Sequence, residues 1–274
     1  MLALLPTYIV AQNLHTVGED FQFVSYLIGN GMKEEATTLI NNRKADCDSM
    51  RFLKAYTYYN VMELDSAAKY YTAVGKNSPL RTESLFFGSV ANLHLEQPNI
   101  AENLLNLVDD TSAMVRNLAM FERAGIKLLK RDFKGFEDCM KLVDTNDYRI
   151  SSEVAEFTRI KKELQKRDKS PLLAATMSAI IPGAGKVYTG NLGEGIATFL
   201  TTGSLIAVTA ENWYKSGFYD WKTILFGTLS ACFYIGNIYG SAVTVRISRD
   251  ALNKQRNVQI LYNIHIPIRN SYRR

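Results

Sequence analysis

The stretch that decides the fold is DSMRFLKAYTYYNVMELDSAAKYYTAVGKNSP, residues 48–79. Its two halves have the composition of two helices that cross each other. Two crossing helices need small residues at the crossing point and large residues beside it, and a proline ends the second one because it has no backbone N–H. Six positions carry this pattern: Ala55, Tyr58, Ala67, Tyr71, Val74 and Pro79. We expect the stretch to form one helical hairpin.

The same frame recurs on both sides of this hairpin. Counted 34 residues further on, the corresponding positions are Ser89, Ala101, Leu105 and Val108. A third, looser unit contains Ala124, Phe133, Met140 and Val143, and an upstream unit covers residues 21–36. Each hairpin exposes an apolar face that only the next one covers, so a polar cap must end the row, and residues 151–169 have that pattern. We expect an all-α array over residues 14–168, and a soluble, folded fragment if the chain is cut at Asp168.

This pattern is similar to the tetratricopeptide repeat, which is 34 residues long. The resemblance covers about half of the chain and is most specific in residues 48–79. It implies a solenoid of helical hairpins that binds a segment of another protein. Three tyrosines are candidates for the partner groove: Tyr56, Tyr59 and Tyr70. The alternative is that these rings pack between helices, where such repeats usually carry aromatic residues.

Residues 170–256 predict a small helical membrane domain. Uncharged runs of 15, 16 and 23 residues cover 171–185, 195–210 and 223–245. Because a bilayer core about 30 Å thick needs about 20 apolar residues of helix, we expect two spans, over residues 192–214 and 223–245. Residues 171–181 are too short for a span and end at Pro182, which predicts a re-entrant or interfacial half-helix. The alternative is a buried hairpin in a soluble helical protein.

The segment PGAGKVYTG supplies the second set of candidate site residues: Pro182, Gly183, Gly185, Lys186, Tyr188 and Gly190. It resembles the Pro-Gly-x-Gly-Gln-x-Tyr signature of a small membrane domain that follows periplasmic tetratricopeptide repeats in Gram-negative envelope proteins. The function of that domain is not established, and Lys186 stands here where Gln is usual. The proline and glycines predict a tight reversal of the chain, with Lys186 and Tyr188 at the level of the lipid headgroups. The alternative is a binding site.

Charge and composition narrow the classes of function that this protein can have. Residues 1–150 hold 16 Lys and Arg against 19 Asp and Glu, whereas residues 151–274 hold 16 against 8. A basic segment beside apolar runs indicates a membrane rather than nucleic acid. Three cysteines and three histidines, all far apart, give neither a disulfide framework nor a zinc motif. The glycines near Lys186 lack the first Gly and the Ser or Thr of a phosphate loop, and no catalytic motif appears. We therefore expect a non-enzymatic protein without cofactor or metal.

Residues 1–12 begin MLALLPTYIV and continue to a small residue, Ala11. An apolar run before a small residue is typical of the end of an export signal, although the basic region that opens such a signal is missing. The alternative is an ordinary apolar segment that packs on the first helices.

The last segment, residues 257–274, is a basic tail. Its apolar residues alternate with polar ones over much of its length: Val258, Ile260, Ile264, Ile266 and Ile268. A period of two predicts a short strand, and Pro267 would confine it to the edge of a sheet.

Two functions of different classes follow. The first is a non-catalytic, membrane-anchored scaffold of the bacterial envelope, with the bilayer and an unidentified protein or peptide as partners. The alternative is a membrane domain that works as an insertion or assembly factor or as a small transporter, regulated by the repeats. A transporter is expected to carry an ionisable residue inside a span. Residues 223–245 contain none, which favours the scaffold.

The two topology signals disagree. Two spans and a half-helix leave both flanks on one side of the membrane, and the basic residues of both flanks would place that side in the cytoplasm. The export signal would instead place the repeats in the periplasm. Because a long exported domain crosses largely regardless of the charge beside it, we expect repeats on the periplasmic side of the inner membrane.

A single-cysteine variant tests on which side of the inner membrane the repeats lie. With the native cysteines replaced, Lys76→Cys should react with a membrane-impermeant maleimide in intact cells whose outer membrane has been permeabilised. Labelling that requires a broken inner membrane would put the repeats in the cytoplasm.

Overall fold

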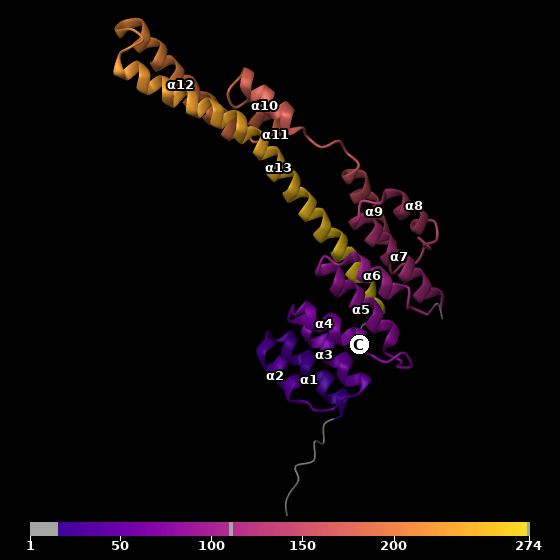
Figure 1. Ribbon diagram of the computed structural model, residues 1–274. Helices are drawn as coiled ribbons and strands as arrows, with labels where there is room; N and C mark the ends of the chain where they lie inside the picture. Colours follow the sequence, from indigo (N-terminus) through magenta and orange to yellow (C-terminus); the bar gives the residue numbers. More distant parts are fainter. Residues whose placement is uncertain (1–15, 110–111, 273–274) are drawn as a thin grey trace, which may run out of the picture. The chain divides into compact units, whose positions relative to one another are not determined.

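The computed structural model describes residues 16–109 and 112–272, and all its regular elements in that part of the chain are helices (Figure 1). The all-α prediction is confirmed. The predicted export signal, residues 1–12, lies outside the described residues. The chain divides into two compact units. The first unit is Met1–Lys161 together with Ile260–Arg274, and the second unit is Lys162–Gln259.

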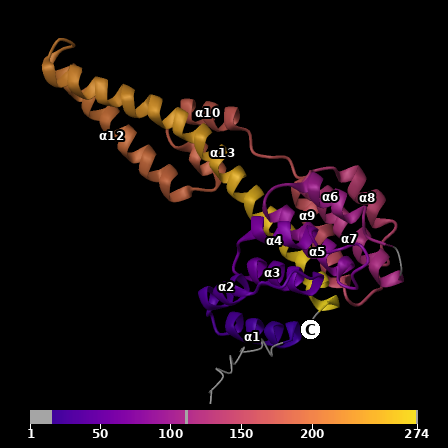
Figure 2. The same ribbon diagram turned by 60° about the horizontal axis from the view of Figure 1, so that its bottom comes forward.

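The first unit is a row of helical hairpins, in which helices that follow each other along the chain pack together (Figure 2). Its helices are α1 (Val17–Gly29), α2 (Lys33–Asn42), α3 (Asp48–Asn60), α4 (Leu64–Thr72), α5 (Arg81–His94), α6 (Pro98–Leu105), α7 (Ala113–Leu129), α8 (Phe133–Met140) and most of α9 (Ser151–Leu164). Helix α3 begins at Asp48, where the sequence frame was counted from. Pro98 stands in the first turn of α6, where its missing N–H costs no hydrogen bond.

The turns inside the four hairpins have one backbone geometry. Each contains a residue with positive φ: Gly31 at 78°, Met62 at 69°, Glu96 at 59° and Arg131 at 60°. In each turn the next residue donates its N–H to a carbonyl five residues back, with an N···O distance of 2.9 Å. This is the Schellman arrangement, which satisfies carbonyls at a helix end. The spacings between successive residues of this set are 31, 34 and 35, close to the period predicted from the sequence.

The small residues of the repeat pattern lie where helices meet. Ala55, Ala67, Ala101 and Ala124 are all fully buried, and Tyr71 beside them is 1% exposed. A methyl group added to Gly88 of α5 would lie 3.2 Å from Cβ of Tyr71. These contacts are tight because a buried interior is close-packed, and a larger residue has no space there.

The predicted strand in the tail is wrong. Residues 257–271 of the tail belong to α13 (Trp221–Ser271), and those from Ile260 onward are part of the first unit. Ile260, Ile264 and Ile268 are fully buried and lie four residues apart, which places them on one face of a helix. Spacing by four contains spacing by two, so alternation alone could not separate the two structures. Pro267 costs a helix about 3 kcal/mol, whereas each buried isoleucine contributes about 1.5–3 kcal/mol, so the helix persists through it.

The tail packs against α7 at Gly125, where the missing side chain leaves space. A methyl group on Gly125 would lie 2.6 Å from the side chain of Ile264 and 3.0 Å from Phe157. Phe157 of α9 stacks on Phe121 of α7 with ring centroids 4.7 Å apart. Helix α9 therefore covers one part of the row and the tail covers another. A fragment ending at Asp168 lacks the three buried isoleucines and would expose the surface that they cover, so its solubility and folding stay a prediction.

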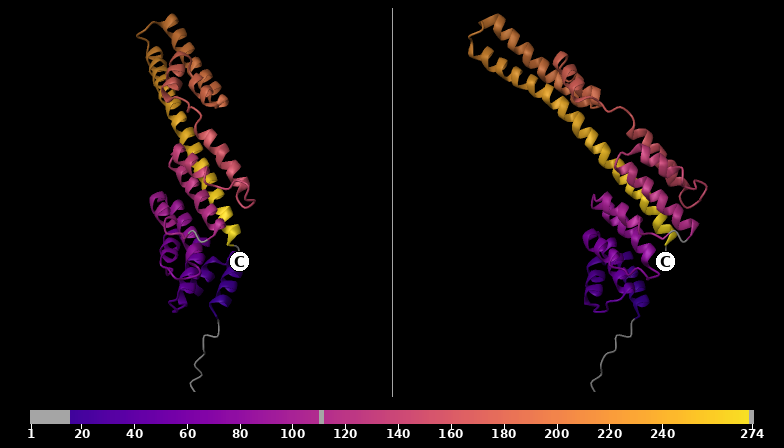
Figure 3. Two further views of the ribbon diagram at one scale, coloured as in Figure 1. Left: turned by 90° about the vertical axis from the view of Figure 1, so that its right-hand side faces the viewer. Right: turned by 45° about the vertical axis from the view of Figure 1, so that its right-hand side comes forward.

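The second unit contains α10 (Pro171–Ile180), α11 (Ala184–Thr189), α12 (Leu192–Ser216) and the part of α13 up to Gln259. In both views of Figure 3, α12 and the first half of α13 run side by side, and Thr209 and Ser230 join them with an Oγ–Oγ distance of 3.1 Å. Among the described helices, α12 alone is long and apolar enough to cross a membrane. The second predicted span, residues 223–245, lies inside α13 and stays a prediction, as does the re-entrant role of α10.

The buried tail gives the first test. Ile264→Asp should lower the free energy of unfolding by about 3–5 kcal/mol, because it removes a fully buried side chain and places a charge in the hollow at Gly125. Val258→Asp is the matched control, since Val258 is exposed on the same helix. Urea unfolding of the whole chain in detergent, followed by circular dichroism, measures both. Equal midpoints for the two variants would contradict the packing of the tail.

Candidate functional site

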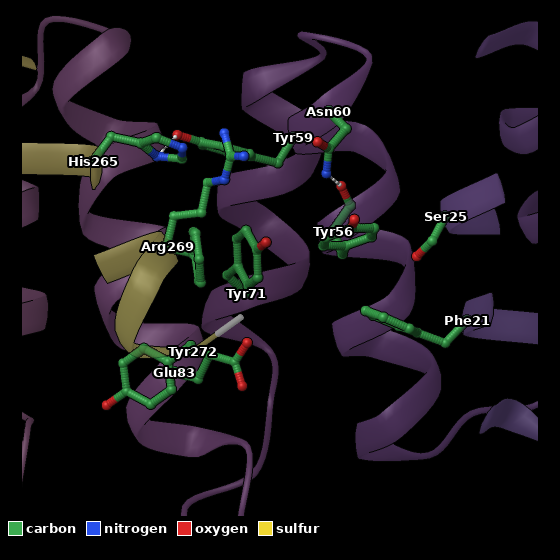
Figure 4. A pocket seen from close by; sticks show the side chains of 11 residues that line it. Phe21, Ser25, Tyr56, Tyr59, Asn60, Tyr71, Glu83, His265, Arg269 and Tyr272 are labelled. Carbon is green, nitrogen blue, oxygen red and sulfur yellow. Dashed lines mark hydrogen bonds between the residues drawn. The ribbon is translucent and has the colours of Figure 1, made fainter. Parts of the chain in front are cut away.

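The first unit contains a cavity of about 380 Å³. Residues of α1, α3, α4, α5 and the tail of α13 line it: Phe21, Ser25, Tyr56, Tyr59, Asn60, Tyr71, Glu83, Phe87, His265, Arg269 and Tyr272. Figure 4 shows His265 and Arg269 of α13 on one side of this cavity and Phe21 and Ser25 of α1 on the other. We call it the aromatic pocket.

His265 fixes the tail beside the pocket. Its Nδ1 lies 2.8 Å from the hydroxyl oxygen of Tyr59, and the two rings stack with centroids 5.6 Å apart. Burial, with Arg269 and His94 nearby, lowers the pKa of His265 to about 4, while burial raises the pKa of Tyr59. Both side chains are therefore neutral at pH 7, and the hydrogen bond between them involves no charge.

The predicted groove tyrosines separate into two groups. Tyr56 and Tyr59 line the aromatic pocket, and Tyr56 also packs on Phe21 with ring centroids 4.8 Å apart. Tyr70 does not line it, since it stacks on Tyr58 at 5.6 Å under the ammonium group of Lys54. For Tyr70, the structure therefore fits the alternative in which the ring packs on its neighbours and does not line a partner groove.

The pocket also contains polar groups that the sequence reasoning missed. The hydroxyl of Tyr71 is buried and has no hydrogen-bond partner among the described residues. Glu83 of α5 and Arg269 of α13 bring a carboxylate and a guanidinium group to the same cavity. No spacing rule joins residues 83 and 269, so only the folded chain brings them together. Aromatic walls with one acid and one base suit a peptide segment that carries apolar side chains and polar groups.

A buried carboxyl lies close to this region without lining the pocket. Glu122 of α7 is fully buried, and its two oxygens have no hydrogen-bond partner among the described residues. Burial raises the pKa of Glu122 to about 8, although Ser89 and Arg123 nearby act in the opposite direction. The group is therefore mostly protonated at pH 7, which avoids the cost of an unpaired buried charge.

The glycine motif of the second unit forms a tight turn. Gly183 has φ 85°, and a methyl group on it would lie 2.1 Å from the carbonyl oxygen of Gly195 in α12. Its N–H donates to Oδ1 of Asn237 in α13 at 3.2 Å. Pro182 stands directly before it, after the end of α10. The turn therefore brings α11 close to two longer helices.

Other motif residues tie the short helices to α13. The N–H of Gly185 donates to Oγ of Ser178 at 2.9 Å, and Ser178 lies 2.7 Å from Oγ of Ser241. A methyl group on Gly185 would lie 2.1 Å from the carbonyl oxygen of Ala174. Gly190, with φ 102°, ends α11. Of the two alternatives for the motif, a structural turn and a binding site, these contacts favour the structural turn.

Two motif side chains make polar contacts of a different kind. The Tyr188 hydroxyl accepts the N–H of Ser170 at 3.3 Å, and its ring lies 5.7 Å from the ammonium group of Lys169. Nζ of Lys186 donates to Oγ1 of Thr198 in α12 at 3.0 Å. Lys186 lines a cavity of about 490 Å³ with a further threonine, Thr202, whose buried hydroxyl has no partner among the described residues.

Comparisons with known proteins return no match: no family model matches the chain, and neither does a curated protein or a solved structure. Among the described residues, no group of three His, Cys, Asp or Glu side chains is placed to hold a metal ion. The resemblance to tetratricopeptide repeats stays a prediction.

Glu122 makes stability depend on pH. Its folded pKa, about 8, exceeds the usual 4.5, so the folded state holds a proton that the unfolded state loses as pH rises. The free energy of unfolding should therefore fall by roughly 2 kcal/mol or more between about pH 5 and about pH 8. Glu122→Gln should remove this loss, whereas Glu156→Gln, on the exposed face of α9, should keep it. Urea unfolding at several pH values measures the slopes, and a wild-type slope in Glu122→Gln would contradict the assignment.

Proposed function

We propose that this chain is a non-catalytic, membrane-anchored scaffold of the bacterial cell envelope. In this proposal the first unit is a tetratricopeptide-like solenoid that binds a segment of a partner protein, and the second unit holds it at the bilayer. The observation that carries the proposal is the aromatic pocket, whose lining combines an acid and a base with the buried hydroxyl of Tyr71, which has no hydrogen-bond partner among the described residues.

The chemistry of the pocket suits a peptide. Six of its lining residues are aromatic, and aromatic side chains contribute large contact areas at low cost in conformational entropy. Glu83 and Arg269 would pair with polar groups of the segment, and Tyr71 would regain a hydrogen bond. A bound segment that satisfies a buried hydroxyl gains affinity, because an unpaired buried polar group is costly.

The surface of the second unit supports membrane anchoring. Large apolar side chains are exposed on both long helices, among them Phe199 and Ile206 of α12 and Phe233 and Ile235 of α13. In water such a surface would be unfavourable, whereas lipid tails would cover it. We propose that α12 and residues 223–245 both cross the inner membrane, that α10 and α11 enter it from one side, and that the repeats are periplasmic.

One observation favours the alternative, in which the membrane domain is the active part. Lys186 places an ammonium group against a cavity lined by α12 and α13, and an ionisable residue at membrane depth often marks a functional path. The Thr198 hydroxyl is its hydrogen-bond partner, and the lining residues include no acid.

Photo-crosslinking tests the scaffold. A photoreactive phenylalanine analogue at position 56 should give a defined adduct in cells, because Tyr56 lines the pocket, whereas the same analogue at position 70 should not. Arg269→Glu should abolish the adduct, since it reverses the charge at the pocket. Lys54→Glu, a charge reversal beside Tyr70, should keep it. Identical adducts at the two positions, or an adduct that survives Arg269→Glu, would contradict partner binding at this pocket.

A further inference from the structure

A basic cavity in the second unit has no role in the scaffold as described so far. Its volume is about 190 Å³, and the segment after α9 and one face of α13 supply most of its lining. Five of the lining residues are cationic: Lys166, Arg167, Lys169, Arg249 and Arg256. Two are acidic, Glu163 and Asp168. The cavity therefore carries a clear excess of positive charge.

Two of these cations have partners in the structure. Nζ of Lys169 donates to the carbonyl oxygen of Thr189 at 3.0 Å, and Arg256 faces Glu163 with an N···O distance of 3.8 Å. In the described part of the chain, no ion pair or hydrogen bond involves the side chains of the other three, which are exposed. Lys166, Arg167 and Arg249 thus present charge to whatever enters the cavity.

The cavity lies where the apolar helices end. Val245 is the last residue of the uncharged run 223–245, and Thr189 is the last residue of α11, three positions before α12 begins at Leu192. Both line the cavity, so it lies at the end of the uncharged run of α13 and beside the end of α11. Val245 is buried, and Leu252 adds a second apolar side chain about two turns further along the same face of α13. An apolar floor under a basic rim is the arrangement that an amphipathic anion requires.

We propose that this cavity binds the headgroup phosphate of an anionic phospholipid, an inference that rests on the membrane anchoring proposed above. Lys166, Arg167 and Arg249 would contact the phosphate, and Val245 and Leu252 would contact the start of the acyl chains. Basic cavities beside the ends of membrane helices are suited to such headgroups. Free phosphate would leave the apolar floor uncovered, so the lipid is the occupant that satisfies both parts of the site.

The test uses the whole chain in lipid nanodiscs. Phosphatidylglycerol is added in increasing proportion to phosphatidylcholine, and lipid that stays bound after transfer to the gas phase is counted by native mass spectrometry. The wild type should retain phosphatidylglycerol preferentially. Lys166→Gln with Arg249→Gln should weaken this preference by about fivefold for each cation removed. Arg246→Gln with Lys222→Gln removes the same charge from two exposed positions outside the cavity and should leave the preference unchanged.

The outcomes separate this site from the anchoring itself. Equal retention of both lipids by the wild type, equal losses in the two double variants, or displacement of the lipid by inorganic phosphate would each overturn the lipid site. Failure of the wild type to enter nanodiscs of phosphatidylcholine alone would instead overturn the membrane anchoring.

Discussion

The close approach of Ile264 to Gly125 is the contact on which the first unit depends. A side chain on residue 125 would occupy the space that the isoleucine fills, so the glycine is required there by shape. Through this contact the last turns of α13 cover a face of the hairpin row. The solenoid predicted from the sequence would end in a polar cap. Here α9 provides part of the cover and a segment from the far end of the sequence provides the rest, which is why the groove predicted for a partner is already partly filled.

The remaining space is the aromatic pocket, and its polar groups are arranged at some cost to stability. Tyr71 buries a hydroxyl that finds no hydrogen-bond partner in the described part of the chain, and burial keeps Glu122 close by mostly protonated. Such groups weaken a fold unless something pairs with them, since each costs about 1–3 kcal/mol. Natural proteins tolerate this most often at functional sites. The same reasoning links the pocket to the scaffold proposal, because a bound segment would supply the missing partner.

The second unit is stabilised differently. Small residues permit its helices to approach each other closely, and hydrogen bonds between hydroxyl groups join them. Gly183 and Gly185 bring backbone atoms of α10, α11 and α12 into contact, and the Ser178–Ser241 pair joins α10 to α13. Close packing of small residues and neutral side-chain hydrogen bonds both contribute to helix association in lipid, which fits the proposed membrane anchoring. Most charged side chains of the second unit lie outside its uncharged runs. Beside the end of one of these runs, Lys166 and Arg249 meet at the basic cavity.

The sequence by itself determined the all-α class and the hairpin at residues 48–79, because small residues at helical spacing let two helices cross closely. It also located the glycine turn, since φ values such as that of Gly183 exclude most other residues. It did not determine the end of the chain, where isoleucines four residues apart fit both a strand and a helix until a covering face is known. Nor did it reveal that Glu83 and Arg269 share a pocket with Tyr56 but not with Tyr70. Those facts depend on which faces meet in the folded chain, and contacts between residues nearly two hundred positions apart leave no mark in local spacing.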